Sequence, residues 1–312
     1  MINTARAKVN LYLHVAGKRD DGYHLLDSLV TFASVGDELS ICHPERPEGV
    51  EGSHSFKTVI PASDSASRDP SATANAFAQD DRISLKIDGN FSNSLSNYND
   101  NLIIRAAHAL ADEFNITPKA HITLTKNLPI GAGIGGGSSD AATSLKLLNK
   151  LWNINANDEK LAEIGLKLGS DIPVCIYNDD CKISGIGEVI EPVKLPHIPL
   201  VLVNPRVEIS SAEIYQKGVD KYSGKVNLPN NFRNIEELSN FLKTTNNDLY
   251  PNALSQAPIL ADVLAEITSQ AGGLFANMSG SGSTCFGIFE DDEMAKLAIE
   301  NIGKKKPDWW VS

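Results

Sequence analysis

Five glycines fall within the seven positions from Gly131 to Gly137, and two serines follow them directly. Because glycine has no Cβ, the backbone N–H groups of such a run can converge on one point. The residues after Ser138 favour a helix, whose first N–H groups are unpaired and carry the positive end of the helix dipole. The segment 129–142 therefore predicts a binding site for a phosphate or a similar anion.

Two familiar glycine loops do not account for this run. Gly131, Gly133 and Gly136 satisfy the G-x-G-x-x-G spacing, but a dinucleotide fold also needs a buried strand before the loop and an acidic residue about 20 residues after it. Residues 120–126 instead alternate apolar and polar, and residues 157–160 open another helix. No Lys-Ser or Lys-Thr follows the last glycine, so the Walker A loop is excluded as well.

The run 129–142 resembles the glycine-serine motif of the galactokinase, homoserine kinase, mevalonate kinase and phosphomevalonate kinase superfamily (GHMP kinases). Four further segments are similar, in order and spacing, to the superfamily members that act on 4-diphosphocytidyl-2-C-methyl-D-erythritol. These segments are residues 7–11 (AKVNL), 21–24 (DGYH), 169–174 (GSDIPV) and 279–283 (SGSGS). Together they span nearly the whole chain, which is a specific match.

This resemblance implies an α+β fold with two domains. The N-terminal domain of such kinases binds ATP, the C-terminal domain completes the site for the second substrate, and a cleft lies between them. We place the boundary near residue 185, which gives domains of residues 1–185 and 186–312. Residues 43–81 are rich in Pro, Ser, Ala, Asp and Gly and predict a surface insertion in the first domain.

Phosphoryl transfer depends on alignment of the reacting groups and on neutralisation of charge. The resemblance implies that Lys8 and Asp171 are catalytic: Asp171 accepts the proton of the substrate hydroxyl, and Lys8 beside it keeps the carboxylate ionised. Taken singly, a solvated strand face would be the simpler interpretation of Lys8, and a turn residue that of Asp171. The other motifs favour the catalytic interpretation.

The resemblance also implies where ATP binds. The glycine run with Ser138 and Ser139 would hold the β- and γ-phosphates, and Mg²⁺ would bridge the phosphate oxygens without a predicted metal ligand from the protein. Asn101 and Lys126 match family positions near the nucleotide, although a helix cap and a strand-end charge are their simpler interpretations. The predicted ATP-binding residues are Pro129, Ile130, Gly131, Ala132, Gly133, Ile134, Gly135, Gly136, Gly137, Ser138, Ser139, Asn101 and Lys126.

For the second substrate, the resemblance points to Asn10, Tyr23 and His24 as partners of a cytidine diphosphate group. An aromatic ring and an imidazole can stack on a pyrimidine or hydrogen-bond to it, whereas a small acceptor such as homoserine needs neither. Relatives often carry an aromatic residue where Val30 stands here. Tyr215 is therefore expected to cover one face of the base.

These residues together predict ATP-dependent phosphorylation of the 2-hydroxyl of 4-diphosphocytidyl-2-C-methyl-D-erythritol, in the non-mevalonate route to isopentenyl diphosphate. One alternative is another GHMP small-molecule kinase, of homoserine or mevalonate type. The other is a catalytically idle nucleotide-binding module, but such a module needs neither Lys8 nor Asp171.

Composition narrows the class of protein further. The net charge of −11 argues against a general nucleic-acid or membrane-surface binder. The start of the chain lacks an apolar signal core, and the longest apolar run, 198–203, is too short to cross a bilayer, which predicts a cytoplasmic protein. Its 4 cysteines have no C-x-x-C spacing, so buried or idle thiols are expected.

Hydrophobic periodicity predicts the elements that carry these motifs. Residues 5–15 alternate as a strand, which places Lys8 and Asn10 on one face. Further strands are predicted over 25–35, 38–42, 83–87, 172–176 (as extended chain), 200–203, 274–278 and 284–289. Helices are predicted from residue 102, capped by Asp100, and over 139–152, 158–168, 211–218, 235–243, 252–268 and 291–302.

Overall fold

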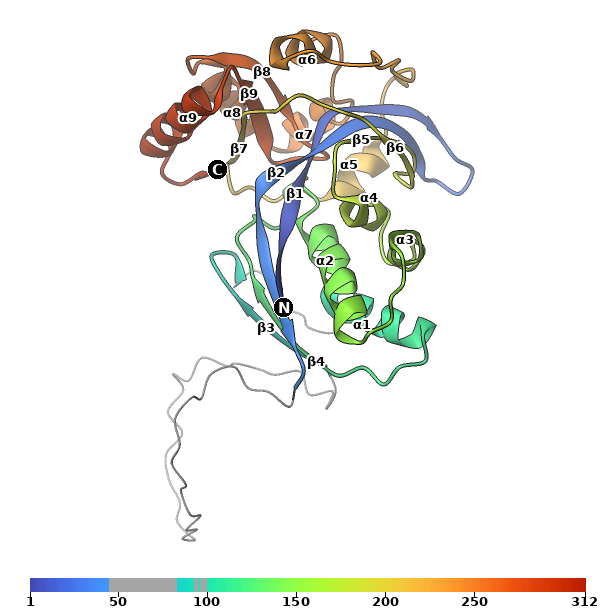
Figure 1. Ribbon diagram of the computed structural model, residues 1–312. Helices are drawn as coiled ribbons and strands as arrows, with labels where there is room; N and C mark the ends of the chain where they lie inside the picture. Colours follow the sequence, from blue (N-terminus) through green and yellow to red (C-terminus); the bar gives the residue numbers. More distant parts are fainter. Residues whose placement is uncertain (45–82, 93–94, 96–99) are drawn as a thin grey trace, which may run out of the picture.

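Two long antiparallel strands, β1 (Ile2–Lys18) and β2 (His24–Cys42), run through both halves of the molecule (Figure 1). The computed structural model describes residues 1–44, 83–92, 95 and 100–312, so the predicted insertion 43–81 lies almost wholly outside the described residues. Both predicted strands, 25–35 and 38–42, are strand in the structure, but the predicted break between them is wrong because they form one continuous strand. Gly36 lets β2 continue, because a Cβ there would lie 2.4 Å from the carbonyl oxygen of Ala5.

The predicted alternation along β1 accounts for the burial of only one of its two faces. Its apolar positions are buried, as expected, but Lys8, Asn10 and Tyr12 on the other face are 4%, 1% and 0% exposed. Tertiary contacts bury this second face, among them the Lys8–Asp171 ion pair and the hydrogen bond from Tyr12 to Asp27, and a sequence pattern of period two cannot report them. Lys8 and Asn10 do share a face, as predicted, since both line one cleft.

The first sheet has six strands. Its order is β3 (Ile83–Asp88), β4 (Ala120–Thr125), β2, β5 (Cys181–Gly185) and β6 (Val189–Pro192), with β1 paired to β2. Only β3 and β4 are parallel among the described pairings. Sequence analysis did not identify β5 and β6. The domain boundary near residue 185 stays a prediction, and β6 beyond it belongs to this sheet.

Four helices pack on one face of this sheet (Figure 1): α1 (Leu102–Glu113), α2 (Gly136–Leu151), α3 (Asp158–Leu166) and α4 (Ile172–Tyr177). The cap of α1 is Asn101 and not Asp100, because the Asn101 side chain accepts from the N–H of Ile103 at 2.9 Å. Extended chain over 172–176 is also wrong. This apolar run is the helix α4, whose first turn suits Pro173 and whose buried residues show no period.

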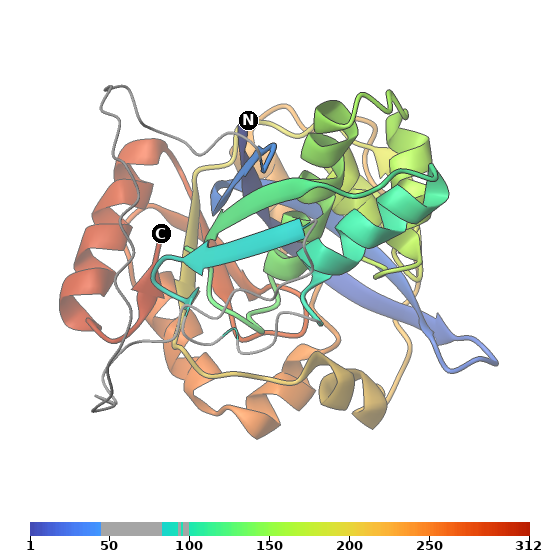
Figure 2. The same ribbon diagram turned by 90° about the horizontal axis from the view of Figure 1, so that it is seen from below.

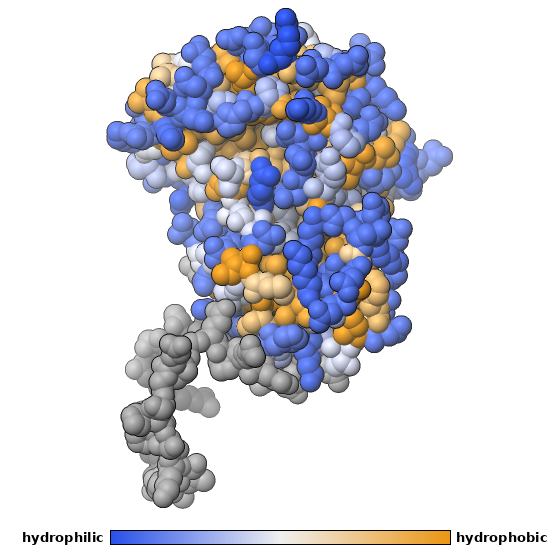
Figure 3. Space-filling model, viewed as in Figure 1, coloured by the Kyte–Doolittle hydropathy of each residue, from blue (hydrophilic) through white to orange (hydrophobic). Residues whose placement is uncertain are grey.

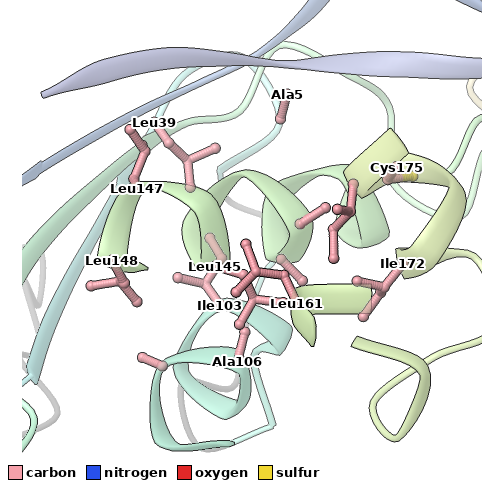
Figure 4. Packing of buried hydrophobic residues seen from close by; sticks show 14 of the residues in the cluster. Ala5, Leu39, Ile103, Ala106, Leu145, Leu147, Leu148, Leu161, Ile172 and Cys175 are labelled. Atoms are coloured by element: carbon pink, nitrogen blue, oxygen red, sulfur yellow. The ribbon is translucent and has the colours of Figure 1, made fainter. Parts of the chain in front are cut away.

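Leucine and isoleucine side chains from these helices form one core with the sheet (Figure 4). In this cluster Leu147 of α2 lies beside Leu39 of β2, and Leu145 of α2 lies beside Ile103 of α1. All four side chains are at most 4% exposed. Burial of this many apolar side chains stabilises the fold by roughly 1.5–3 kcal/mol for each large one. The core therefore holds α2, and with it the glycine run at its start, firmly on the sheet.

The C-terminal half is a second antiparallel sheet, in the order β10 (Trp310–Val311), β7 (Leu200–Asn204), β9 (Cys285–Phe289) and β8 (Gly273–Met278). The predicted helix over 252–268 is in fact two helices, since Pro258 follows a break at Ala257. The helices of this half are α5 (Ser211–Lys217), α6 (Ile235–Leu242), α7 (Tyr250–Gln256), α8 (Ile259–Thr268) and α9 (Asp292–Lys305).

The two halves share β1. Leu13 and Val15 of this strand pack in the core of the second sheet beside Val201 and Val203. Seen from below, the green helices of the first half and the red helix α9 lie on opposite sides of the molecule (Figure 2). Figure 3 shows hydrophilic side chains over most of one face, with smaller hydrophobic areas between them. No helix in the described ranges has the length and apolar character to cross a membrane.

Candidate active site

A cleft of about 1000 Å³ lies where the two halves meet, and residues of both glycine-rich loops line it. This volume suits two small phosphorylated ligands. All but two of the predicted site residues line the cleft. They are Lys8, Asn10, Tyr23, His24, Asn101, Lys126, Pro129, Ile130, Gly131, Ala132, Gly133, Gly135, Gly136, Gly137, Ser138, Asp171 and Tyr215.

Ile134 and Ser139 are the two that do not line the cleft. Ile134 is 1% exposed and packs in a hydrophobic cluster. The Ser139 hydroxyl donates to the carbonyl oxygen of Arg6 at 2.7 Å and lies 3.3 Å from the sulfur of Cys175. Burial raises the pKa of the Cys175 thiol to about 12, so this neighbour is uncharged. The Ser139 side chain thus ties α2 to β1, while Ser138 faces the cleft.

Lys8 and Asp171 form an ion pair in the cleft. The Lys8 Nζ lies 2.8 Å from the Asp171 Oδ2, and the two side chains are 5% and 37% exposed. Lys8 comes from the middle of β1, and Asp171 precedes α4, so both are held by packed elements. This geometry places a carboxylate and an ammonium together at the wall of the cleft, where both can contact one ligand hydroxyl.

Positive φ angles shape the glycine loop. Gly131, Gly133 and Gly135 have φ values of +61°, +71° and +63°, a region in which a side chain costs roughly 1–2 kcal/mol. At Gly133 the space is closed as well, because a Cβ would lie 2.5 Å from the carbonyl oxygen of Ser279. A Cβ on Gly280 would likewise lie 2.6 Å from the Gly133 oxygen. The two glycine-rich loops therefore touch through backbone atoms.

The Ser279 hydroxyl joins three segments of the site. It donates to the Gly133 carbonyl oxygen at 3.0 Å and accepts from the N–H of Asn10 at 3.1 Å. The Asn10 amide donates to the Ser28 hydroxyl at 2.8 Å, while its Oδ1 is buried and has no hydrogen-bond partner among the described atoms. A ligand donor in the cleft would satisfy this oxygen, since an unpaired buried acceptor costs about 1–3 kcal/mol.

Lys126 is held by two buried carboxylates that the sequence analysis did not assign. Its Nζ lies 2.5 Å from the Asp37 Oδ2 and 2.7 Å from the Asp140 Oδ2. Burial by itself lowers the pKa of Lys126, but Asp140 and Asp37 together raise it above the ordinary value. We call these three residues the Lys126 triad. Asp140 stands directly after the two serines of the glycine run, whereas nothing in the local pattern marked Asp37.

The opposite end of the cleft carries aromatic side chains. The rings of His24 and Tyr215 have centroids 5.5 Å apart at an angle of 38°, and Tyr23 is 57% exposed. Burial and the nearby Lys18 lower the pKa of His24, so the imidazole is neutral at pH 7. Burial and Asp171 raise the pKa of Tyr215, which keeps its hydroxyl protonated. Val30 is fully buried in the core and does not line the cleft.

No group of three or more His, Cys, Asp or Glu side chains among residues 1–44, 83–92, 95 and 100–312 is arranged to hold a metal ion. The donor set in the cleft is instead backbone N–H groups, two lysines and isolated carboxylates. Such a set fits a metal ion that arrives on phosphate oxygens better than one held in a protein cage.

Glycine loops that meet across a two-sheet cleft, together with a lysine–aspartate pair, define a small-molecule kinase of the GHMP type. The model of the GHMP kinases N terminal domain matches residues 101–179, and that of the GHMP kinases C terminal domain matches residues 229–308. Within this superfamily, the chain is 40% identical, over 98% of its length, to a relative named 4-diphosphocytidyl-2-C-methyl-D-erythritol kinase, and it therefore belongs to the kinases of that name.

Comparison with individual proteins supports this membership. The chain is 40% identical to the 4-diphosphocytidyl-2-C-methyl-D-erythritol kinase of Chelativorans sp. (strain BNC1), over 98% of this chain and 93% of the relative. It is 37% identical to the protein of that name from Paramagnetospirillum magneticum, over 99% and 95%. A crystal structure of a 4-(cytidine 5'-diphospho)-2C-methyl-D-erythritol kinase superposes with a TM-score of 0.71 at 26% identity, covering 100% of this chain and 98% of that one.

Proposed function

We propose that the protein transfers the γ-phosphoryl group of ATP to the 2-hydroxyl of 4-diphosphocytidyl-2-C-methyl-D-erythritol. The products are the 2-phosphate and ADP, a step of the non-mevalonate route to isopentenyl diphosphate. The observation that carries the proposal is the Lys8–Asp171 ion pair of 2.8 Å in a cleft lined by a glycine loop and by aromatic residues. A reaction that consumes ATP and a soluble acceptor is expected in the cytoplasm.

At the nucleotide end, backbone N–H groups of the glycine loop and the N-terminus of α2 bind the β- and γ-phosphates. Ser138 adds a hydroxyl donor from the cleft wall. Asn101, the cap of α1, and Lys126 also line the cleft and would border the nucleotide. Mg²⁺ that arrives with ATP would supply further neutralisation of the phosphate charge.

At the acceptor end, Asp171 takes the proton of the 2-hydroxyl, and the Lys8 ammonium holds the hydroxyl oxygen close to the carboxylate. Asn10 offers its unpaired Oδ1 to a hydroxyl of the same substrate. Tyr23, His24 and Tyr215 bind the cytidine group, since their rings can cover a pyrimidine and the neutral imidazole can hydrogen-bond to it.

This function is favoured over both alternatives. Homoserine and mevalonate have no base to occupy the aromatic end of the cleft, and the relatives at 37% and 40% identity carry the name of the cytidine-dependent kinase. An idle nucleotide-binding module has no use for a buried lysine paired with a cleft carboxylate. Both ends of the cleft therefore agree with the same reaction.

The direct test is a comparison of acceptors. The protein is mixed with Mg·ATP and either 4-diphosphocytidyl-2-C-methyl-D-erythritol, homoserine or mevalonate, and ADP release is followed with phosphorus NMR of the product. We expect a new phosphomonoester only with the cytidine-bearing acceptor. ADP release with homoserine or mevalonate would show that the protein is a kinase with a substrate other than the one proposed. ADP release with none of the three acceptors would contradict the proposed reaction.

A further inference from the structure

The Lys126 triad contains more negative than positive charge. Its three side chains are at most 5% exposed, and they comprise two carboxylates and one ammonium. Water cannot screen a charge at that depth, so the uncompensated carboxylate is unfavourable in its ionised form. Either a proton or a further cation has to balance it.

The two carboxylates are not equivalent. The Asp37 Oδ1 also accepts from the N–H groups of Asn127 and Leu128, at 2.6 and 2.8 Å. The Asp140 Oδ1 is buried and has no hydrogen-bond partner among the described atoms. Both oxygens of Asp37 thus have donors, whereas an oxygen without a donor favours the protonated form of Asp140. The proton therefore belongs on Asp140.

The groups around Asp140 support this assignment. Burial raises the pKa of Asp140 to about 7, against the opposing effect of Lys126, and Asp37 raises it further. Cys175 of α4 also lies near Asp140, but its thiol is uncharged and cannot balance the charge of the carboxylate. From β1, the Lys8 ammonium is committed to Asp171 at 2.8 Å. Lys126 is thus the cation that faces Asp140 directly among the interactions described.

The triad also touches the glycine loop from both sides. Asp37 binds the backbone of Asn127 and Leu128 just before the loop, and Asp140 lies just beyond the first turn of α2, the helix that follows the loop. A Cβ added to Gly136 would lie only 3.3 Å from the Lys126 Nζ. Asp140 and Lys126 both line the cleft in which the loop is exposed. A phosphate bound at the loop therefore adds negative charge next to the triad.

We propose that Asp140 is a positioning residue that takes up a proton when a nucleotide binds to the glycine loop. When the Asp140 carboxyl is protonated, the Lys126 triad can hold both ends of the loop without an excess negative charge next to the phosphates. The proposal rests on the proposed function only in placing nucleotide phosphates at this loop. Nucleotide affinity then falls as the pH rises above neutrality, because the proton becomes harder to obtain.

The test is calorimetric titration with ADP at saturating Mg²⁺, at pH 6.5, 7.5 and 8.5, in two buffers that differ in ionisation enthalpy. The difference between the buffers measures the protons taken up. The wild-type protein should take up a fraction of one proton that grows with pH, and its affinity should fall up to about tenfold for each pH unit above neutrality. Asp140→Asn should remove both effects and bind ADP more tightly than wild type at pH 8.5.

Asp112→Asn, at an exposed position of α1, is the matched control and should behave like the wild type. Comparison with Asp140→Asn also subtracts any proton exchange by the nucleotide itself. Equal proton uptake by wild type and Asp140→Asn would overturn the proposal. If Asp140→Asn does not fold, the measurement on the wild-type protein is the test. ADP binding without proton uptake would overturn this inference and leave the proposed function standing. Failure to bind ADP at all would overturn the nucleotide site as well.

Discussion

The two residues proposed to carry the chemistry lie far apart in the sequence, in β1 and just before α4, and meet in an ion pair. Lys8 is almost completely buried, which leaves its ammonium with Asp171 as the ion-pair partner at 2.8 Å. Asp171 keeps a side-chain exposure of 37%, enough to reach a substrate in the cleft. A buried cation beside a more accessible carboxylate suits the proposed roles, in which Asp171 reaches the acceptor hydroxyl and Lys8 holds it in place.

Asp171→Asn should lower kcat by about 10²- to 10⁴-fold and leave the KM values for both substrates within a few-fold, because an amide cannot accept the hydroxyl proton. Steady-state ADP release measures both constants. Asp179→Asn, in an exposed position after α4, is the control and should retain wild-type rates. An Asp171→Asn variant with more than a tenth of the wild-type kcat would exclude Asp171 as the base.

Tyr215→Ala should raise the KM for the cytidine-bearing acceptor by roughly 5- to 150-fold, since an aromatic face stacked on a base contributes about 1–3 kcal/mol. The ring of Tyr215 lies 5.5 Å from that of His24, so the loss should be confined to the acceptor end. The KM for ATP serves as the internal reference and should not change. Tyr215→Phe keeps the aromatic face and should bind the acceptor nearly as well; equal losses in both variants would show that stacking is not the contribution of Tyr215.

At the scale of elements, the phosphate loop depends on contact between two glycine-rich segments. The loop before α2 and the loop between β8 and β9 approach so closely that neither Gly133 nor Gly280 has room for a Cβ. The N–H of Thr284 also donates to the carbonyl oxygen of Ala132 at 3.0 Å. The conformation of the first loop is therefore maintained by the second, and not by its own glycines alone.

Gly133→Ala and Gly131→Ala separate these two contributions. Both positions have a positive φ, +71° and +61°, but a Cβ on Gly131 meets nothing within 4 Å, whereas one on Gly133 lies 2.5 Å from the Ser279 oxygen. Gly131→Ala should lose roughly 1–2 kcal/mol of stability, and Gly133→Ala about 1–3 kcal/mol more because of the steric conflict. Urea unfolding measures both losses. Equal losses would mean that the contact between the loops carries no strain.

At the scale of the whole molecule, β1 makes the two halves one folding unit. Ala5 packs in the core of the first sheet and its helices, Val9 and Leu11 in the cluster that includes Phe286, and Leu13 in the core of the second sheet. A strand shared in this way cannot leave one core without exposing apolar surface in the others. The cleft between the halves is thus built on a common strand.

Unfolding should consequently be a single cooperative transition. Trp152 reports on the first half, and Trp309 and Trp310 report on the second. One variant keeps Trp152 alone and a second keeps Trp309 and Trp310, with Phe at the other tryptophan positions. The two variants should give coincident urea midpoints by fluorescence. Leu13→Ala should lower both urea midpoints together, and the loss of unfolding free energy should be about 2–5 kcal/mol. Two separate midpoints would mean that the halves unfold independently.

The sequence alone predicted a phosphate-binding glycine run and determined most of the elements around it. The glycine run, the helix after it and the shared face of Lys8 and Asn10 depend on backbone freedom and on periodicity, both of which are local properties. For the same reason, the strand-like alternation over 120–126 and the strand predicted over 284–289 correspond to β4 and β9. The residues that resemble the kinase family then pointed to the cleft that the structure contains.

Only the tertiary structure decided which partners these residues have. The pairing of Asp37 with Lys126, the inward position of Ser139 and the helix at 172–177 could not be read from the chain. A short apolar run buried on all sides has no period that distinguishes helix from strand. Asp37 lies in β2 and Lys126 directly follows β4, so they become partners only when these two strands pair. Packing between segments distant in sequence, and not a local pattern, therefore sets the partner of this buried carboxylate.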